Sequence, residues 1–239
     1  DPVVYTGSVI RRTPAVTDLH IGVDLIQNED FVYGYGSGSD NINAIDGRND
    51  EGFVIITGIG NYTGTKEARY DILPKPLTIS GANPTATVEA VPAQTYTGRQ
   101  LTPKPAVTDI ARAADLIENF DFEYGYGENT NVLSGSLIEG TIYIIGRGNY
   151  SGTVQVSFDI RPKTITLTAG QVAQIAPVEY NGYRHTPEPA ITDIDREAGL
   201  VKGTDFAYTY GTNIDCSLSG TNEGSITITG MGNYTGSIT

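Results

Sequence analysis

Aromatic and smaller residues alternate along three stretches of the chain that have the same form. Phe31, Tyr33 and Tyr35 occupy every second position of the first stretch. Successive side chains of a β-strand point to opposite faces, so this period predicts a strand with one aromatic face. The same pattern recurs twice, at Phe122, Tyr124 and Tyr126 and at Phe206, Tyr208 and Tyr210.

A second alternating run follows each aromatic run, at residues 53–57, 141–145 and 225–229. Its expected inward positions stay apolar while their neighbours vary: Val54 and Ile56, Ile142 and Ile144, Ile226 and Ile228. Residues 154–160 predict an antiparallel return strand, and residues 77–80 and 164–168 predict leading strands. The segments 18–28, 109–119 and 193–203 are expected to form loops with at most a short helix.

A glycine-rich segment of the form Gly-x-Gly-Asn-Tyr-Thr/Ser-Gly separates the second run from the return strand. It occupies residues 58–64, 146–152 and 230–236. Glycine supplies the positive φ that tight hairpin turns require, and asparagine tolerates it. The segment therefore predicts a hairpin turn, formed in the middle copy by Gly146, Gly148, Asn149, Tyr150 and Gly152.

These stretches belong to one unit that is written three times. Tyr5-Thr6-Gly7 returns with Tyr96 and Gly98 and again with Tyr180 and Gly182. A proline and two aspartates follow each tyrosine at fixed spacing: Pro14, Asp18 and Asp30; Pro105, Asp109 and Asp121; Pro189, Asp193 and Asp205. The second and third copies align at a constant offset of 84, and the first aligns with the second at 91 and, after a middle loop, at 88.

A period of this length is typical of a small domain, because solenoid units are only about 20–45 residues long. We expect repeats at residues 1–73, 74–161 and 162–239, with the first lacking leading strands and the third lacking its last strand. The copies are out of phase with the chain ends, which indicates a piece of a longer repetitive protein.

Short strands with frequent turn signals predict an all-β chain of tandem small antiparallel β domains. An immunoglobulin-like sandwich is the first choice for each domain, and a β-grasp-like sheet is the alternative. The expected linkers, Leu73-Pro74-Lys75-Pro76 and Arg161-Pro162-Lys163, are short and contain proline. Such linkers are extended and semi-rigid, so we expect an elongated arrangement of the domains.

Charge and composition exclude several classes of function. The formal net charge is −13 over 239 residues, whereas nucleic-acid binding needs a basic face. No apolar run approaches the roughly 20 residues of a membrane helix, so we expect no membrane insertion in this segment. The single cysteine, Cys216, leaves no internal disulfide.

The repeat pattern resembles the Ig-like and MBG-type tandem repeats of large bacterial cell-surface proteins and adhesins. The resemblance rests on Tyr96-Thr97-Gly98, Asp121-Phe122 and residues 146–152, followed by Phe158 and Ile160. It implies an extracellular location on a bacterial surface and a role as a stalk that displays other domains. Host glycans or proteins would then be bound through other parts of the parent protein.

No constellation for catalysis emerges from the sequence, and we expect that the chain is not an enzyme. The two histidines, His20 and His185, occupy non-equivalent positions, and Cys216 occurs in only one copy. The paired aspartates could in principle act as an acid and a base. They recur together with the turn glycines and core aromatics, however, which favours a role in accepting hydrogen bonds from turn N–H groups.

One acidic loop is a candidate calcium site. Asp40, Asp46, Asp50 and Glu51 lie in the middle loop of the first copy, and Ca²⁺ needs several oxygen ligands in one loop. The spacing is not that of an EF-hand, and the other copies lack the loop. The alternative is a solvated loop without metal, and no other cofactor is expected.

Further alternatives stay open at this point. The Asn-Tyr-Thr/Ser triplets match the N-glycosylation sequon, but the hairpin requires the same residues. A Lys–Asn isopeptide bond needs a lysine at a repeated core position, which Lys66, Lys75, Lys104, Lys163 and Lys202 do not suggest. The principal expectation is a semi-rigid spacer in adhesion. The alternative is a carbohydrate- or protein-binding module that uses the variable loops 37–50, 128–138 and 212–222, or its tyrosine face.

Overall fold

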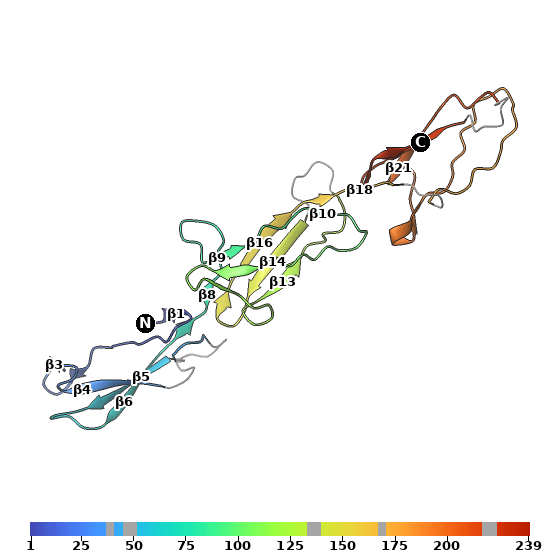
Figure 1. The fold of residues 1–239 in the computed structure, drawn as a ribbon. Helices are drawn as coiled ribbons and strands as arrows, with labels where there is room; N and C mark the ends of the chain where they lie inside the picture. Colours follow the sequence, from blue (N-terminus) through green and yellow to red (C-terminus); the bar gives the residue numbers. More distant parts are fainter. Residues whose placement is uncertain (37–40, 45–51, 133–139, 167–170, 217–223) are drawn as a thin grey trace. The chain divides into compact units, whose positions relative to one another are not determined.

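The computed structural model describes residues 1–36, 41–44, 52–132, 140–166, 171–216 and 224–239 (Figure 1). This part of the chain is all-β, as the sequence predicts, and consists of short strands in several small sheets. The chain divides into two compact units, Asp1–Ala90 with Lys104–Gly125 and Tyr143–Gln155, and Val91–Pro103 with Tyr126–Ile142 and Val156–Thr239. The boundaries expected at 73/74 and 161/162 stay a prediction.

A three-stranded antiparallel sheet is the main element of each repeat. It has the order β4–β5–β6 in the first repeat, β13–β14–β16 in the second and β21–β22–β24 in the third. The alternating runs and the return strand of the sequence are thereby confirmed. The strands are Phe31–Tyr35, Gly52–Gly58 and Thr65–Tyr70; Phe122–Tyr126, Gly140–Gly146 and Thr153–Phe158; and Phe206–Tyr210, Ile226–Gly230 and Ser237–Ile238.

Two-residue parallel pairs complete the repeats, and the sequence did not suggest them. β1 pairs with β7, and β10 with β17, so that the start of a repeat lies beside its end. β8 pairs with β15, and β18 with β23, which holds each linker against the following repeat. These strands are Val3–Val4, Ile72–Leu73, Gln94–Thr95, Ile160–Arg161, Lys75–Pro76, Tyr150–Ser151, Lys163–Thr164 and Tyr234–Thr235.

Small antiparallel pairs form the loop that follows the repeated proline. They are β2–β3, β11–β12 and β19–β20, and a 3₁₀ helix, η1, links the last pair. In the second repeat β9, which precedes the proline, pairs with β11 as a third strand. The expected loops are therefore short antiparallel hairpins, which the sequence did not predict, and of the described residues only the third segment contains the short helix that was allowed for. The bounds are Thr17–Asp18, Val23–Asp24, Ala86–Val88, Val107–Asp109, Ala114–Asp115, Thr192–Asp193, Ala198–Gly199 and, for η1, Ile194–Arg196.

The expected leading strands are placed differently in the structure. Residues 77–80 lie outside any strand, and the paired residues are Lys75 and Pro76 just before them. The cause is local: the Thr78 N–H donates to Thr85 Oγ1 at 2.9 Å, and the Thr85 N–H donates to Thr78 Oγ1 at 3.1 Å. These side-chain bonds replace a strand ladder with a turn. In the third repeat the strand is likewise Lys163–Thr164, and residues 167 and 168 lie outside the described part.

The apolar faces of the central strands form the core of each repeat. Val54, Ile142, Ile144 and Ile228 are buried as predicted, whereas Ile56 and Ile226 are only half-buried. The tyrosines of the aromatic strands are half-buried too, and the hydroxyls of all but Tyr210 reach the segment that contains the repeated proline. The Tyr35 hydroxyl donates to the Arg12 carbonyl at 2.9 Å, and Tyr33, Tyr124 and Tyr208 donate to Pro14, Pro105 and Pro189.

The second repeated aspartate has the scaffold role that the sequence predicts. Oδ2 of Asp30, Asp121 and Asp205 accepts a backbone N–H four residues earlier, at 2.9 Å in all three repeats. The bond closes the loop immediately before the aromatic strand.

Candidate functional site

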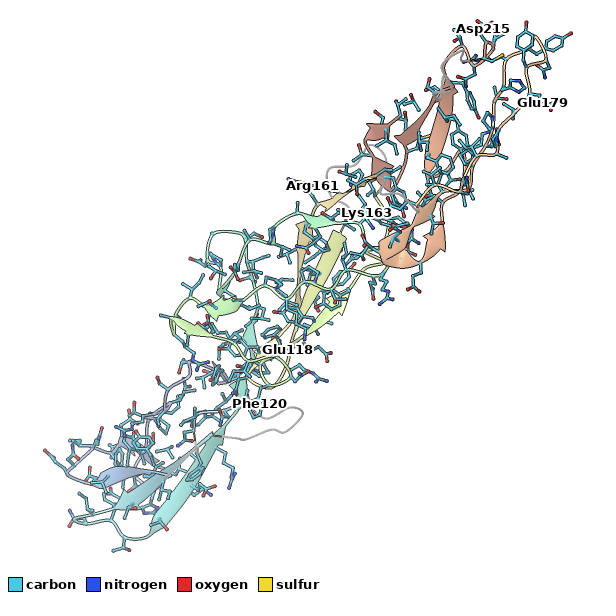
Figure 2. All side chains as sticks on the ribbon, turned by 45° about the vertical axis from the view of Figure 1, so that its right-hand side comes forward. Glu118, Phe120, Arg161, Lys163, Glu179 and Asp215 are labelled. Carbon is cyan, nitrogen blue, oxygen red and sulfur yellow. The ribbon has the colours of Figure 1, made fainter. Side chains whose placement is uncertain are left out.

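Two clusters of polar and aromatic side chains lie where one repeat follows the next, and each lies within one of the two units. We call each a junction clasp. The first consists of Tyr5, Lys75, Asp109, Arg112 and Tyr150. The second consists of the equivalent residues Tyr96, Lys163, Asp193, Arg196 and Tyr234, of which Lys163 is labelled in Figure 2.

A buried carboxylate is the centre of the first junction clasp. The Asp109 side chain is 0% exposed, and Lys75 Nζ donates to its Oδ1 and Oδ2 at 2.7 and 2.8 Å. The Tyr150 hydroxyl donates to Oδ2 at 2.8 Å, and the Arg112 N–H donates to Oδ1 at 3.1 Å. The carboxylate thereby joins the linker to two separate loops of the second repeat.

Aromatic contacts extend this cluster to the first repeat. Arg112 Nη1 donates to the Tyr150 hydroxyl at 2.9 Å, and its guanidinium lies over the Tyr5 ring, 5.9 Å from the centroid. The Tyr5 and Tyr150 rings meet edge to face with centroids 5.6 Å apart. Tyr5 is only 6% exposed. A cation over a ring and an edge-to-face ring pair are both favourable geometries, so these contacts hold the two repeats together.

Asn149, from the glycine-rich turn, makes a further contact across the first junction. Its Oδ1 accepts the Ala44 N–H at 2.7 Å, and its Nδ2 donates to Asn43 Oδ1 at 3.0 Å. The Asn149 carbonyl also accepts the Lys75 N–H of the linker at 2.8 Å. One turn residue thus bonds both the preceding repeat and the linker.

The second junction clasp repeats these contacts. Tyr234 donates to Asp193 Oδ2 at 2.9 Å, and Arg196 donates to the Tyr234 hydroxyl at 2.6 Å. The Arg196 guanidinium lies 5.2 Å from the centroid of Tyr96, whose ring is 5.6 Å from that of Tyr234.

Asn233 takes the place of Asn149 at this junction. Its Oδ1 accepts the Val132 N–H at 2.7 Å, and its Nδ2 donates to Asn131 Oδ1 at 3.0 Å. The agreement of the tyrosine, arginine and asparagine contacts indicates that the sequence encodes one junction geometry twice.

The two clasps differ in the environment of the lysine. Lys163 Nζ donates to Asp193 at 2.6 Å and also to Asp195 Oδ2 at 2.8 Å, whereas Lys75 pairs with Asp109 alone in the contacts described. The Asp195 side chain is 80% exposed, so this second ion pair contributes little stability.

The charges of the clasps are fixed near neutral pH. Burial raises the pKa of Asp109, but hydrogen bonds from Lys75, Tyr150 and the Arg112 N–H outweigh it and hold the pKa below its ordinary value. The pKa of Asp193 is lowered in the same way, by Lys163 and Tyr234 against burial. Burial raises the pKa of Tyr150, and it raises that of Tyr234 to about 12, so both phenols stay protonated donors.

This arrangement suits mechanical fixation better than catalysis. Each carboxylate is ionised and already accepts several hydrogen bonds, which leaves it little capacity to take up a substrate proton. Burial lowers the pKa of Lys163, but hydrogen bonds to Asp193 and Asp195 outweigh it and hold the pKa above its ordinary value, so this lysine is a poor nucleophile. What the cluster does well is to hold a linker and two neighbouring repeats in one geometry.

The sequence pattern revealed only part of the clasp. It identified Tyr96, Asp109, Asn149 and Tyr150 as repeated positions. The structure brings Tyr150 to Asp109 in the first clasp and Tyr96 to Tyr234 in the second. It missed Arg112 and Arg196. These two arginines are 84 residues apart, which is the offset between the second and third copies, and this spacing could have identified them. The first repeat has Ile21 at this position, so the arginine is absent from the threefold pattern.

The expectation that the lysines share no repeated core position is wrong. Lys75 and Lys163 are equivalent at an offset of 88, and their side chains are only 13% and 23% exposed. Asp109 and Asp193 are 84 residues apart, and because the lysine offset differs from this value, the equivalence of the two lysines was hidden. Each lysine pairs with an aspartate rather than with the asparagine that an isopeptide bond of this kind would need.

The calcium prediction cannot be placed on the fold, because Asp40, Asp46, Asp50 and Glu51 lie outside the described residues. Within the described ranges, no group of three or more His, Cys, Asp or Glu side chains is arranged to hold a metal ion. The variable loops of the binding-module alternative also lie largely outside these ranges. Of the part that the structure describes, no helix has the length and apolar character needed to span a membrane.

Comparisons of the chain with protein-family models, with curated proteins and with solved structures find no match.

Proposed function

We propose that this chain is a non-catalytic spacer whose β repeats are held in a fixed direction by the junction clasps. The repeats supply length, and the clasps limit bending at the linkers. We further propose that it belongs to a bacterial surface or secreted protein that acts in adhesion, with partners bound elsewhere in that protein.

The observation that carries the proposal is the presence of the same clasp at both junctions. A flexible tether needs no buried Asp–Lys pair at each linker, since glycine- and serine-rich segments already give flexibility. Here each linker instead contains proline, pairs as a strand with the following repeat and includes a lysine bound to an aspartate. These features all restrict motion between neighbouring repeats.

Small-angle X-ray scattering at low protein concentration tests the proposal. Three units in line should have a radius of gyration of roughly 30 Å, whereas a single globule of this length should have about 18 Å. The lower value would contradict the spacer function.

A variant separates stiffness from length. The double substitution Arg112→Ser and Arg196→Ser removes both cations that lie over the tyrosine rings. We expect a broader distribution of interatomic distances while each repeat stays folded, as circular dichroism would show. Arg99→Ser is the matched control, because Arg99 is exposed and lies outside both clasps. An unchanged distribution in the double variant would mean that the clasps do not set the stiffness.

A further inference from the structure

We propose that the middle repeat resists tensile force along the chain, through two parallel strand pairs at the points where the chain enters and leaves it. The first, which we call the entry pair, is β8 with β15, and the second, which we call the exit pair, is β10 with β17. Each pair lies within one of the two units. The inference goes beyond the spacer function, because a spacer needs length and stiffness but no resistance to being pulled.

The direction of the strands decides how a pull acts on these pairs. β8 follows the first repeat directly, and β17 leads directly into the linker to the third repeat. Only Gly152 and Asp159 separate β15, β16 and β17 along the chain. A pull from the preceding repeat therefore acts on the first strand of each pair toward its N-terminal end, and a pull from the following repeat acts on the second strand toward its C-terminal end. Because the paired strands are parallel, these pulls draw them apart along their own axis.

The hydrogen bonds of each pair run across this axis, with the slant typical of parallel strands, and so they share the force. Backbone N–H groups of the first strand, or directly after it, donate to carbonyls at the second: Lys75 to Asn149 and Leu77 to Ser151 at 2.8 Å, and Gln94 to Asp159 and Tyr96 to Arg161 at 2.9 Å. Bonds that share a force must break together. The bonds of a hairpin that is pulled open from its end break one after another.

Buried side chains beside both pairs keep water from these bonds. Leu77 and Tyr150 at the entry pair are 4% and 2% exposed, and Tyr96 and Ile160 at the exit pair are 6% and 3% exposed. Backbone hydrogen bonds that water can reach open most readily, because water replaces the lost partner. Burial therefore slows the separation of the strands under force.

The entry pair has a further attachment through a side chain. Lys75 on β8 donates to the fully buried carboxylate of Asp109, which belongs to β11. Separation of β8 from β15 would draw the ammonium group away and leave a buried carboxylate without its ion-pair partner, which is strongly unfavourable. The ion pair therefore adds to the barrier that opposes the pull.

The recurrence of these pairs favours a mechanical role. β18 with β23 repeats the entry pair and β1 with β7 repeats the exit pair, with equivalent N–H bonds of 2.7 to 2.9 Å. Parallel pairing is slightly less stable per residue than antiparallel pairing, so stability alone does not account for it. An antiparallel pair at the same points would receive both pulls at one end and open bond by bond. Parallel pairing gives the resistance to force that antiparallel pairing lacks.

Single-molecule force spectroscopy at constant force tests the proposal on the full chain, tethered at its two ends. Gln94→Pro removes one N–H donor of the exit pair and is compatible with extended backbone. We expect the lifetime of the middle repeat under force to fall about tenfold, which corresponds to the loss of one hydrogen bond. Ile144→Val is the matched control, because Ile144 is 0% exposed on β14, outside both pairs, and its truncation costs a similar equilibrium stability. It should change this lifetime by less than about twofold, since the core is still packed when the pair separates.

A disulfide identifies the unfolding step of the middle repeat. Thr95 and Arg161 are exposed register partners in the exit pair. Thr95→Cys with Arg161→Cys, made together with Cys216→Ser, shortens that step when oxidised. Equal changes in the lifetime of this step in Gln94→Pro and Ile144→Val would overturn the proposal.

The direction of the pull gives a second test that does not require Gln94→Pro to fold. When Thr95→Cys and Arg161→Cys are reduced and each carries a handle, the force acts across one end of the exit pair, whose bonds then break one after another. We expect the middle repeat to open at least about tenfold faster than at the same force applied through the chain ends. Equal lifetimes in the two directions would overturn the proposal.

These outcomes are independent of the radius of gyration, which tests the spacer function. An elongated chain can contain strand pairs that separate at once under force. Strand pairs that resist force can equally occur in a chain that bends at its linkers.

Discussion

The Tyr150 hydroxyl donates a 2.8 Å hydrogen bond to the carboxylate of Asp109, whose side chain is fully buried at the first junction. The same hydroxyl accepts a hydrogen bond from Arg112, which lies over the ring of Tyr5 in the preceding repeat. One phenol therefore connects the anchor of the linker to the contact between repeats. A substitution that removes either hydrogen bond should therefore weaken both the anchor of the linker and the contact between the repeats.

Tyr150→Phe tests this connection, because it removes the hydroxyl and keeps the ring. Asp109 loses a donor in a buried site, and Arg112 loses its acceptor. We expect a loss of about 1–3 kcal/mol in the free energy of unfolding of the unit. Chemical denaturation followed by circular dichroism measures it. Tyr143→Phe is the control, since Tyr143 is 37% exposed and a surface change of this kind should cost less than about 0.5 kcal/mol.

Stability should fall in acid because of the two buried aspartates. The pKa values of Asp109 and Asp193 are lower in the folded chain than their ordinary value. A group of this kind contributes stability above its unfolded pKa of about 4 and loses it as the pH falls through the folded pKa. We expect the melting temperature to drop more steeply below about pH 4 in the wild type than in Asp109→Asn. Equal slopes would contradict the role assigned to this carboxylate, and Glu89→Gln, at an exposed position, is the control.

Gly7→Ala should loosen the first junction for two separable reasons. Gly7 has a φ of 80°, which costs a side-chain-bearing residue about 1 kcal/mol, and an added Cβ would lie 2.7 Å from Arg112 Cδ. Gly22→Ala isolates the first cost, because Gly22 has a φ of 70° and no atom within 4 Å of the added carbon. We expect a larger loss of melting temperature for Gly7→Ala, and equal losses would show that Arg112 moves away at no cost.

The contact of Arg196 with Tyr96 should show a coupling energy of about 1 kcal/mol in a double-mutant cycle of Arg196→Ala and Tyr96→Leu. Because Tyr96 is buried, this coupling should persist when salt is raised to about 1 M. The exposed pair of Lys104 and Glu118, at 2.7 Å, is the comparison, and its coupling should decrease under the same conditions. A coupling near zero at Arg196 would remove the cation–ring contact from the account of the junction.

The calcium prediction for the acidic loop is tested by thermal unfolding. If the loop binds Ca²⁺, the melting temperature should rise with millimolar Ca²⁺ over that in a chelator, because ligand binding stabilises the folded state. Asp46→Ala should abolish the rise, and Asp215→Ala, in the third repeat, should not. No rise in the wild type would remove the site.

The sequence predicted the fold elements better than the contacts between repeats. Alternation with period 2 is a local property, and it correctly identified β4, β5 and their equivalents and the buried positions Val54, Ile142 and Ile228. The leading strand at residues 77–80 was wrong because Thr78 and Thr85 bond each other through their hydroxyls, a pairing seven residues apart that periodicity does not report.

The repeated pattern of the chain, and the fact that its shared residues belong to a scaffold, followed from the sequence alone, because equal spacing is visible without coordinates. Only the tertiary structure decided that Lys75, Asp109, Arg112 and Tyr150 meet Tyr5 in one clasp. These residues come from four separate segments, and their approach depends on how the linker pairs with the glycine-rich turn. A linear pattern records only the spacing of residues along the backbone. Which residues form a buried ion pair depends instead on which surfaces are desolvated together when the repeats pack.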